Sequence, residues 1–561
     1  MNLSFSSITP TRLRAVHYGL LMVMCLALFG PGRDRLPPID RDESRYMQAT
    51  SQMLESGNYV DVRFQDQPRY LQPAGIYWLE AASVSLLSSP EAKEPWAYRV
   101  PSLIGATVAV LLTAYVGSAL FGPSAGLVSA LLLACSVLLG IEARMATIDA
   151  TLLAAIMAAQ AALLRVFLDR EAGAPPRRWL AACYWAALGV GLMLKGPVIL
   201  LVSWGTLLGL FAAERRVGWW RRLYPAWGIP LMLLIVLPWC VAIWVVSNGS
   251  FFVHSVVGNF LGKVASGQQN HGLPPGYHLL AFALAFWPGS LLAVLAIPYT
   301  WAQRRSPPVR FLLAWIVPTW VVFEAVATKL PHYVLPTYPA IACLTAAAAL
   351  APVPWRFGRV WRSVAWICGI LWAVISLGLA VTGPVLLWWV QSTIQVFPVL
   401  AGLAAAALAV GMLVASARRQ PGRALAAAGL ASLLVAVSSY GFVLPDLQAM
   451  WLSPRIAAAV RAVRPCPDSV VASASYSEPS LVFLVGKDTQ LVKAGDAADF
   501  LLAHQSCGLA LIGRADAAAF LARMTAGDVT PRPLAKVSGI NYSANGRRLD
   551  LTLYAGPRIV K

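Results

Sequence analysis

The chain has 561 residues, of which 58% are hydrophobic and only 12% are charged. Soluble domains carry about 25% charged residues, so this composition excludes an ordinary soluble protein and an intrinsically disordered one. The 44 Lys and Arg residues exceed the 25 Asp and Glu residues by 19, which in a soluble chain would suggest nucleic-acid binding. In a chain this apolar, a polytopic α-helical membrane protein with basic cytosolic loops is the better interpretation.

The apolar segments predict about 13 transmembrane helices, because a bilayer core requires about 20 apolar residues per helix. These segments are residues 15–31, 99–121, 124–140, 147–167, 179–194, 196–213, 223–246, 276–300, 311–327, 332–352, 363–388, 396–416 and 424–444. A shorter apolar stretch, 74–87, carries Glu80 and is interpreted as an interfacial helix of the first outer loop. The first span lacks a clear small-residue cleavage site, so we interpret it as an uncleaved anchor rather than a signal peptide.

Paired arginines predict the orientation of these spans. With a cytosolic N-terminus, every paired-arginine loop before residue 450 lies on the cytosolic side, as the positive-inside rule requires. The pairs are at 177–178, 215–216, 221–222, 304–305 and 418–419. Counting 74–87 as a span would reverse the sides of all later loops, so the charge pattern favours the interfacial helix. The first outer loop, 32–98, is then the longest and most charged.

The composition changes after residue 447, which divides the chain into a transmembrane domain, 1–447, and a small α/β domain, 448–561. Amphipathic runs at 454–463 and 496–503 alternate with β-like runs at 469–474, 481–485, 508–512 and 549–554. Thirteen spans place this domain in the periplasm. Six cysteines lie in spans and are interpreted as small packing residues, whereas Cys466 and Cys507 lie in the outer domain. These two are candidates for a disulfide in an oxidising compartment, with two free thiols as the alternative.

The first outer loop contains a cluster of charged residues at the start of an amphipathic helix. Asp42 and Glu43 precede Ser44, and Tyr46 lies on the apolar side of the predicted helix. A carboxylate just above the bilayer could accept a proton from a nucleophile. The alternative is structural, with Asp42 capping the helix and Glu43 pairing with nearby arginines.

Further polar residues lie at the outer ends of other spans. They are Asp149, Lys195, His271, Lys329 and His332. Each alone could be structural, but carboxylates and cations gathered at one membrane face suit a substrate with a phosphate and a lipid tail. No Cys/His cluster has metal-ligand spacing and no Gly-rich phosphate loop is present, so we predict no metal centre or cofactor. A divalent ion between His271 and either His278 or His332 is the alternative.

Several ordered motifs resemble those of the membrane-embedded C-type glycosyltransferases. They are residues 42–46, 69–78, Arg99, 147–149, 195–197 and 329–333. The resemblance covers about residues 15–350. It is closest to the bacterial 4-amino-4-deoxy-L-arabinose transferases that modify lipid A, and to protein mannosyltransferase-like enzymes.

The resemblance implies inverting transfer of one sugar from a polyprenyl phosphate such as undecaprenyl phosphate, at the periplasmic face of the bacterial inner membrane. The acceptor would be lipid A, the anchor of lipopolysaccharide, or another envelope molecule. It further implies that Asp42 is the catalytic carboxylate and that Asp149 lies near the acceptor. The implied donor-binding residues are Arg45, Arg69, Lys195, Lys329 and Tyr333, with Tyr77 as a further candidate.

One position departs from the family pattern. Gln72 stands where relatives commonly have a lysine before the proline of the first-loop motif. Glutamine donates a hydrogen bond but supplies no charge, so another cation would have to bind phosphate there. The alternative functions are a transporter or flippase of a lipid-linked saccharide, a protein O-glycosyltransferase and a lipid-binding scaffold. The charges at one face and the lack of a repeat argue against the transporter.

Overall fold

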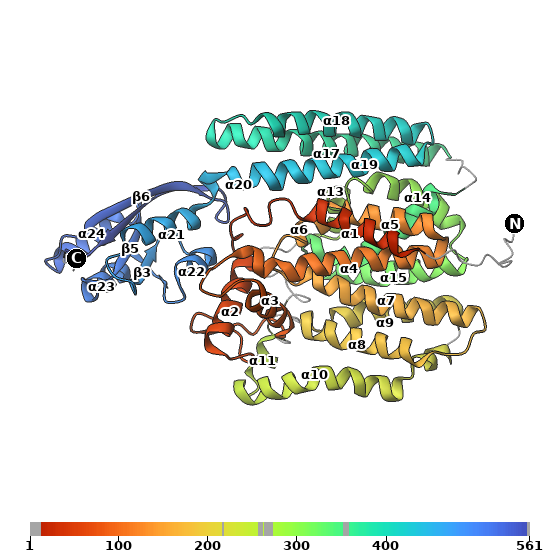
Figure 1. Ribbon diagram of the computed structural model, residues 1–561, viewed down its shortest axis with the longest axis horizontal. Coiled ribbons are helices and arrows are strands. Elements are labelled where there is room, and N and C mark those ends of the chain that lie inside the picture. Colours follow the sequence, from red (N-terminus) through yellow and green to blue (C-terminus); the bar gives the residue numbers. More distant parts are fainter. Residues whose placement is uncertain are drawn as a thin grey trace.

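The computed structural model describes residues 13–215, 218–255, 258, 262, 273–351 and 358–557. They form a bundle of helices, from one end of which a smaller α/β region projects (Figure 1). The helices of the bundle are α1 (Ala15–Phe29), α2 (Asp42–Ser56), α3 (Gly75–Leu87), α4 (Pro95–Phe121), α5 (Pro123–Ala134), α6 (Val137–Glu142), α7 (Asp149–Glu171), α8 (Arg178–Lys195), α9 (Val198–Glu214), η1 (Gly218–Leu223), α10 (Pro225–Ser247), α11 (Ser250–Phe252), α13 (Tyr277–Ala285), α14 (Ser290–Ala302), α15 (Pro307–Ala325), η3 (Pro331–Thr337), α16 (Tyr338–Ala349), α17 (Arg359–Gln391), α18 (Val396–Ala417), α19 (Pro421–Ala436), η4 (Val437–Val443), α20 (Leu444–Asp446) and η5 (Gln448–Met450).

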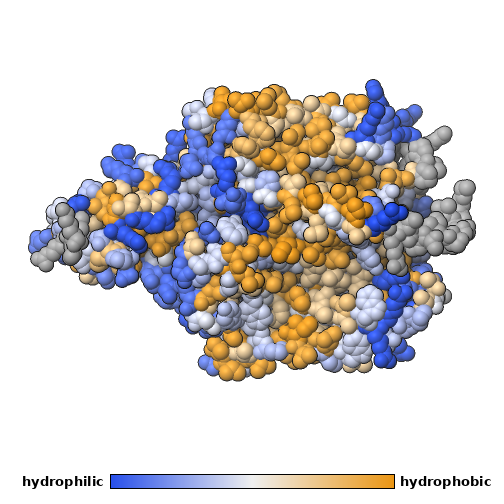
Figure 2. Space-filling view, viewed as in Figure 1, coloured by the Kyte–Doolittle hydropathy of each residue, from blue (hydrophilic) through white to orange (hydrophobic). Residues whose placement is uncertain are grey.

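The outside of the bundle is apolar. Figure 2 shows hydrophobic side chains over its middle and hydrophilic ones gathered toward its two ends. Large apolar side chains such as Trp366 and Leu234 are 74% and 71% exposed, which would be unfavourable in water and is expected in lipid. Among the described residues, seven helices are long and apolar enough to cross a membrane: α4, α7, α10, α15, α17, α18 and the continuous helix Pro421–Asp446. The chain is therefore a polytopic helical membrane protein.

The remaining predicted spans coincide with shorter or interrupted helices. Residues 276–300 form α13 and α14, which are separated near Pro288, and residues 124–140 are divided between α5 and α6. The total of thirteen spans therefore stays a prediction. Helices are present in both segments of the first outer loop where they were predicted, as α2 and α3.

The α/β region comprises residues 452–555, which we call the C-terminal region. Its elements are α21 (Leu452–Val463), β3 (Val471–Ala474), α22 (Pro479–Val485), β4 (Gln490–Leu491), α23 (Ala494–Ala503), β5 (Leu509–Gly513), α24 (Ala517–Ala526), β6 (Arg532–Asn541) and β7 (Arg547–Ala555). The strand order is β4-β3-β5-β7-β6; β3 is parallel to β4 and β5, and β7 is antiparallel to β5 and β6. A separate hairpin, β1 (Arg63–Phe64) with β2 (Gln67–Pro68), lies in the first outer loop.

Side-chain alternation along the strands builds two apolar layers in the C-terminal region. Leu509 and Leu511 pack in the layer that contains α21, whereas Ala510 and Ile512 pack in the layer that contains α23 and α24. The prediction of a strand at 481–485 is wrong. Pro479 occupies the first turn of α22, where its fixed φ favours a helix and its missing N–H costs nothing.

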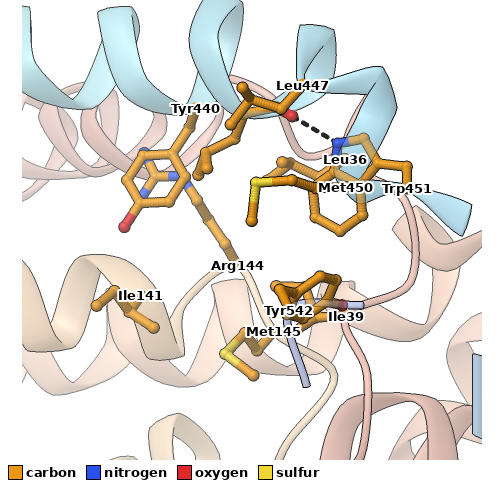
Figure 3. Close-up of a pocket in the computed structure, with 11 residues that line it drawn as sticks. Leu36, Ile39, Ile141, Arg144, Met145, Tyr440, Leu447, Met450, Trp451 and Tyr542 are labelled. Carbon is orange, nitrogen blue, oxygen red and sulfur yellow. Dashed lines mark hydrogen bonds between the residues drawn. The ribbon is translucent and has the colours of Figure 1, made fainter. Parts of the chain in front are cut away.

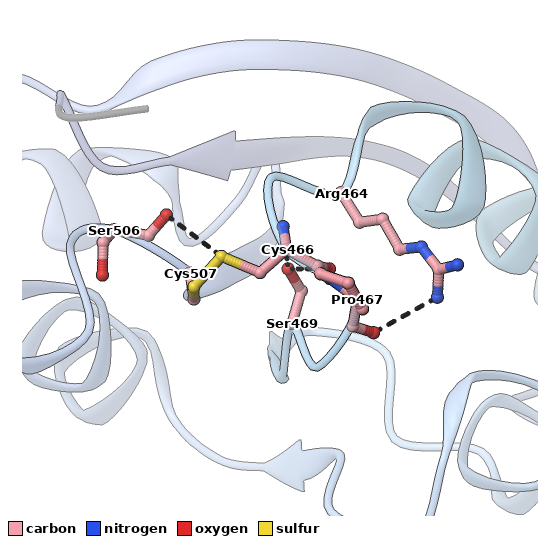
Figure 4. The surroundings of a disulfide bond; sticks show 6 residues. All are labelled: Arg464, Cys466, Pro467, Ser469, Ser506 and Cys507. Atoms are coloured by element: carbon pink, nitrogen blue, oxygen red, sulfur yellow. Dashed lines mark hydrogen bonds between the residues drawn. A yellow bond between two sulfur atoms is a disulfide. The ribbon is translucent and has the colours of Figure 1, made fainter. Parts of the chain in front are cut away.

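A disulfide joins Cys466, which follows α21, to Cys507, which precedes β5 (Figure 4). The two cysteines are 41 positions apart in the sequence. A covalent link over this distance restricts the unfolded chain and so favours the folded C-terminal region.

The C-terminal region contacts the first outer loop directly. Phe483 of α22 packs in one apolar cluster with Met47 of α2 and Tyr98 of α4. Its ring lies edge-on to that of Tyr98, with 5.5 Å between centroids. The loop therefore packs against the C-terminal region as well as against the helical bundle.

Candidate active site

Four of the polar residues predicted from the sequence lie at the ends of elements that meet. Asp149 is the first residue of α7, Lys195 is the last residue of α8, and His332 and Tyr333 lie in η3. Lys195 Nζ lies 2.6 Å from Asp149 Oδ1 and 5.9 Å from the centre of the Tyr333 ring. His332 Nε2 lies 3.9 Å from the other oxygen of Asp149. These residues therefore form one cluster.

Glu142, at the end of α6, is a further member that the sequence analysis did not select. Its Oε1 lies 3.7 Å from His332 Nδ1, and its Oε2 accepts a hydrogen bond of 3.1 Å from Thr147. Burial, followed by the charge of Asp149, raises the pKa of Glu142 to about 8. Its position seven residues before Asp149, where an apolar run ends, was the only signal available in the sequence.

Close backbone contacts hold the two helix ends of this cluster. A Cβ on Gly105 of α4 would lie 2.7 Å from Cα of Thr151 in α7, so only glycine permits this approach. Ser102, one turn earlier in α4, donates to the carbonyl of Thr147 at 3.0 Å. Gly75 of α3 similarly lies against the carbonyl of Met193 in α8. Asp149 and Lys195 are thus placed by backbone packing as well as by their own ion pair.

Arg69 and two tyrosines form a second group beside the cluster. The Arg69 guanidinium lies 5.1 Å from the centre of the Tyr46 ring, and its Nε donates to Tyr77 Oη at 3.0 Å. The Gln72 amide donates to the hydroxyl of Tyr46. Burial, Tyr77 and the charges of both Asp42 and Asp149 raise the pKa of Tyr46. The hydroxyl of Tyr46 therefore lies within electrostatic reach of both predicted carboxylates.

Asp42 is the exposed member of the site. Its side chain is 69% exposed, and its Oδ1 lies 3.8 Å from Arg45 Nη1. It is the first helical residue of α2, and Arg41 rather than Asp42 occupies the N-cap position. The charge of Asp42 also contributes to the raised pKa of Glu142. Asp42 is therefore near the cluster and accessible to a bound molecule.

Glu43, the neighbour of Asp42, is entirely buried and has a structural position. Its two oxygens accept hydrogen bonds of 2.8 and 2.9 Å from Arg99 and of 2.8 Å from the backbone N–H groups of Ile39 and Ala146. Because all four donors saturate this carboxylate, it is not available to a substrate. The ion-pairing alternative from the sequence analysis therefore describes Glu43 correctly.

Lys329, another predicted residue, makes different contacts. Lys329 is buried and donates from Nζ to the carbonyl of Val326 at 2.6 Å. The carbonyl of the next residue, Leu330, lies 3.2 Å from His278 Nε2, and Nδ1 of the same ring lies 3.3 Å from Glu324 Oε2. His271 lies outside the described residues, so the predicted histidine pairings that include it are not described either.

One group of side chains in the described chain could hold a metal ion. Ligand atoms of Glu142, Asp149 and His332 all lie within 4.8 Å of one another, and carboxylate oxygens with an imidazole nitrogen suit divalent transition metals. Lys195 already places a positive charge 2.6 Å from Asp149. A cation bound here would therefore compete with the ammonium group of Lys195.

An apolar cavity of about 190 Å³ lies between the first outer loop, α6 and the segment that leads into the C-terminal region (Figure 3). Arg144 crosses one wall and stacks on Tyr440, with 4.0 Å from its Cζ to the ring centre. Its guanidinium donates to the carbonyls of Pro31, Gly140 and Leu28. Its charge is therefore directed at backbone carbonyls.

Residues 38–257 match the family described as dolichyl-phosphate-mannose-protein mannosyltransferase. The crystal structure of ArnT from Cupriavidus metallidurans bound to undecaprenyl phosphate superimposes with a TM-score of 0.74 at 18% identity, covering 97% of this chain and 100% of that one. The chain has the C-type glycosyltransferase fold. The resemblance predicted from its motifs is confirmed.

Two further proteins show how far this likeness extends. An undecaprenyl phosphate-α-4-amino-4-deoxy-L-arabinose arabinosyl transferase of Pseudomonas paraeruginosa is 27% identical over 310 residues, or 54% of each chain. The chain thus matches about half the length of such curated relatives. The archaeal oligosaccharyltransferase AglB of Archaeoglobus fulgidus, in complex with an inhibitory peptide and a dolichol-phosphate, has a TM-score of 0.53 at 10% identity, covering 97% of this chain and 74% of that one.

The buried position of Glu43 predicts a large loss of stability in Glu43→Gln. The change leaves the Arg99 guanidinium buried without a counter-charge, which costs about 3–5 kcal/mol. Thermal unfolding of the detergent-purified protein, followed by size-exclusion chromatography after heating, measures this loss. Glu55→Gln, on the same helix and paired with Lys93 at 3.1 Å near the surface, is the matched control and should cost about 1 kcal/mol or less. Equal unfolding midpoints for the two variants would contradict the assignment.

Proposed function

We propose that this chain is an inverting glycosyltransferase that moves one sugar from a polyprenyl phosphate to an envelope lipid. The observation that supports it best is that the two carboxylates each lie beside a cation, Asp149 at 2.6 Å from Lys195 and Asp42 at 3.8 Å from Arg45, with Asp42 exposed to an incoming molecule. A base next to cations is what this reaction requires, because one partner must lose a proton while the other leaves as a phosphate.

The proposed reaction is a single displacement at the anomeric carbon. An acceptor oxygen attacks this carbon, the bond between the carbon and the phosphate oxygen breaks, and its electron pair leaves with the polyprenyl phosphate. Asp42 takes the proton of the acceptor oxygen. Its exposure lets an acceptor approach, and its ion pair with Arg45 at 3.8 Å is long enough to open. A phosphate that is paired with cations needs no additional general acid.

Asp149 has a different role in this proposal. Its contact with Lys195 at 2.6 Å fixes the carboxylate beside a cation, which suits orienting an acceptor rather than accepting its proton. Lys195, Arg45 and Arg69 are the proposed phosphate ligands, and Tyr333 lines the site beside Lys195. Gln72 orients Tyr46 by a hydrogen bond. Arg69, which lies over the same ring, supplies the positive charge that relatives obtain from a lysine at position 72.

The relatives suggest particular substrates. Relatives named undecaprenyl phosphate-α-4-amino-4-deoxy-L-arabinose arabinosyl transferases make undecaprenyl phosphate-aminoarabinose the first donor to test. Lipid A, which the motif resemblance implies, is the first acceptor to test. The match to protein mannosyltransferases makes a protein acceptor the second possibility. The proposed location is the bacterial inner membrane, with the N-terminus in the cytosol and the C-terminal region in the periplasm, because paired arginines then face the cytosol.

The base assignment predicts that Asp42→Asn lowers kcat by about 10²–10⁴-fold, since an amide cannot accept the proton. Transfer of radiolabelled aminoarabinose from undecaprenyl phosphate to lipid A in detergent measures it. Asp66→Asn changes an exposed carboxylate in the β1–β2 turn of the same loop and should retain wild-type turnover. Near-normal turnover of Asp42→Asn would refute the role of Asp42, whereas an inactive wild-type enzyme would refute the donor or acceptor.

The raised pKa of Glu142 predicts a loss of activity in alkaline solution. Below about pH 8 the buried carboxyl is protonated and neutral; above it, a second negative charge appears beside Asp149 and competes for Lys195. We expect kcat/KM for the donor to fall above about pH 8 in the wild type. Glu142→Gln, which stays neutral, should lose this decline. Glu55→Gln should keep the wild-type profile, and an unchanged decline in Glu142→Gln would contradict the explanation.

A further inference from the structure

The segment that leads into Asp42 forms a turn that is closed by hydrogen bonds from the side chains of Glu43 and Ser44. The Glu43 carboxylate accepts from the N–H of Ile39 at 2.8 Å, and Ser44 Oγ donates to the carbonyl of Ile39 at 2.6 Å. These bonds draw residues 39–44 into a tight turn. Neither of these two bonds involves Asp40 or Arg41, which lie in the middle of the turn.

Arg41 carries an unfavourable backbone conformation at this point. Its φ is +72° and its ψ is −99°, a region that residues with a side chain rarely adopt. The residue directly precedes Asp42, and its carbonyl accepts the N–H of Arg45 in the first turn of α2. A relaxation of Arg41 toward negative φ would therefore change the direction in which Asp42 enters the site.

Three contacts from the C-terminal region fall on Asp40 and Arg41. The N–H of Asp40 donates to Tyr542 Oη at 2.8 Å, and the N–H of Ser480 donates to Asp40 Oδ1 at 3.2 Å. The Arg41 guanidinium donates to the carbonyl of Ser543. These partners lie more than 400 positions later in the sequence, in the β6–β7 turn and at the start of α22.

The β6–β7 turn is itself fixed. Asn541 donates to Glu478 Oε1 at 3.0 Å and accepts from the N–H of Ser543 at 3.1 Å. The Tyr542 ring packs edge-on against Trp451, with 5.7 Å between centroids, and lines the same cavity as Ile39 (Figure 3). The phenol of Tyr542 is therefore fixed in position and can fix the segment that contains Asp40.

We propose that Tyr542, together with Ser480 and Ser543, positions the Asp42 carboxylate by holding the strained turn at Arg41. The C-terminal region is then part of the catalytic machinery through a positioning residue, Tyr542, which does not touch substrate. The inference rests on the proposed role of Asp42. It is physically reasonable because a base must be held within a fraction of an ångström, and a 1 Å displacement costs about a hundredfold in rate.

The test is Tyr542→Phe in the full-length protein. It removes the hydroxyl that accepts from Asp40 and keeps the ring that packs on Trp451. With undecaprenyl phosphate-aminoarabinose and lipid A, we expect kcat to fall by about tenfold while KM for the donor changes by less than about twofold. Hydrogen–deuterium exchange of peptides covering residues 38–45 should become faster.

Tyr554→Phe is the matched control, because it removes a hydroxyl from β7, where the ring packs on Phe520. It should leave kcat and the exchange of residues 38–45 unchanged. A second comparison uses Arg41→Gly, since glycine adopts φ near +70° without steric cost. In that background Tyr542→Phe should lower kcat by less than about threefold, because no strain remains to be held.

The outcomes separate the two hypotheses. If the wild type transfers sugar and Tyr542→Phe matches Tyr554→Phe in kcat and in exchange, the positioning role is refuted and the proposed function stands. An equal loss of kcat in both Arg41 backgrounds also refutes it, because a general loss of stability would act in that way. If the wild type transfers nothing to lipid A or protein, the proposed function fails. Unchanged hydrogen–deuterium exchange of residues 38–45 in Tyr542→Phe would independently refute the positioning role of Tyr542.

Discussion

The candidate site depends on one buried interaction, the ion pair between Glu43 and Arg99. Neither side chain has any exposed surface, and an uncompensated charge there would cost several kcal/mol. Arg99 uses its remaining donors on the carbonyls of Arg33, Leu36 and Pro37, while Glu43 also accepts from the N–H of Ala146. One carboxylate thus joins the segment before Asp42 to the segment before Asp149. The segments that carry Asp42 and Asp149, the two proposed functional carboxylates, are thus linked through a third, buried one whose hydrogen bonds are all made.

The charges around this pair show how a site rich in carboxylates can still attract a phosphate. Asp42, Glu142 and Asp149 would together repel an anionic donor if all three were ionised. Burial and the charge of Asp149 favour the neutral form of Glu142 near pH 7, and Lys195 neutralises Asp149. In the proposed reaction, the positive charges of Arg45 and Arg69 then bind the phosphate of the donor. The same reasoning separates the neighbouring acids, because Asp42 is exposed and is the proposed base, whereas Glu43 is buried and structural.

The sequence predicted those features that depend on local pattern. Long apolar runs predicted α4, α7 and α8, and the polar residues at the ends of α7 and α8 predicted Asp149 and Lys195 as part of one cluster. Features that depend on contacts between distant segments were not predictable. In the sequence, Glu142 is an ordinary residue at a helix end, and only its contact with His332, 190 positions later in the chain, makes it part of the cluster. The run 481–485 is equally apolar as strand or helix, and only Pro479 at its start indicated the helix that is present.

The strained conformation of Arg41 illustrates the same limit at the level of one residue. Nothing in the local sequence indicates a positive φ, which costs about 1–3 kcal/mol and persists only where surrounding contacts impose it. Those contacts come from the turn around Tyr542, in a part of the chain that resemblance to the glycosyltransferases left least defined. Burial raises the pKa of Asp40, which accepts one of these contacts, to about 6, so this junction is also where the protein holds a poorly solvated carboxyl. A strained residue beside a poorly solvated one is expected where geometry matters more than stability. The residue that this geometry directs is Asp42.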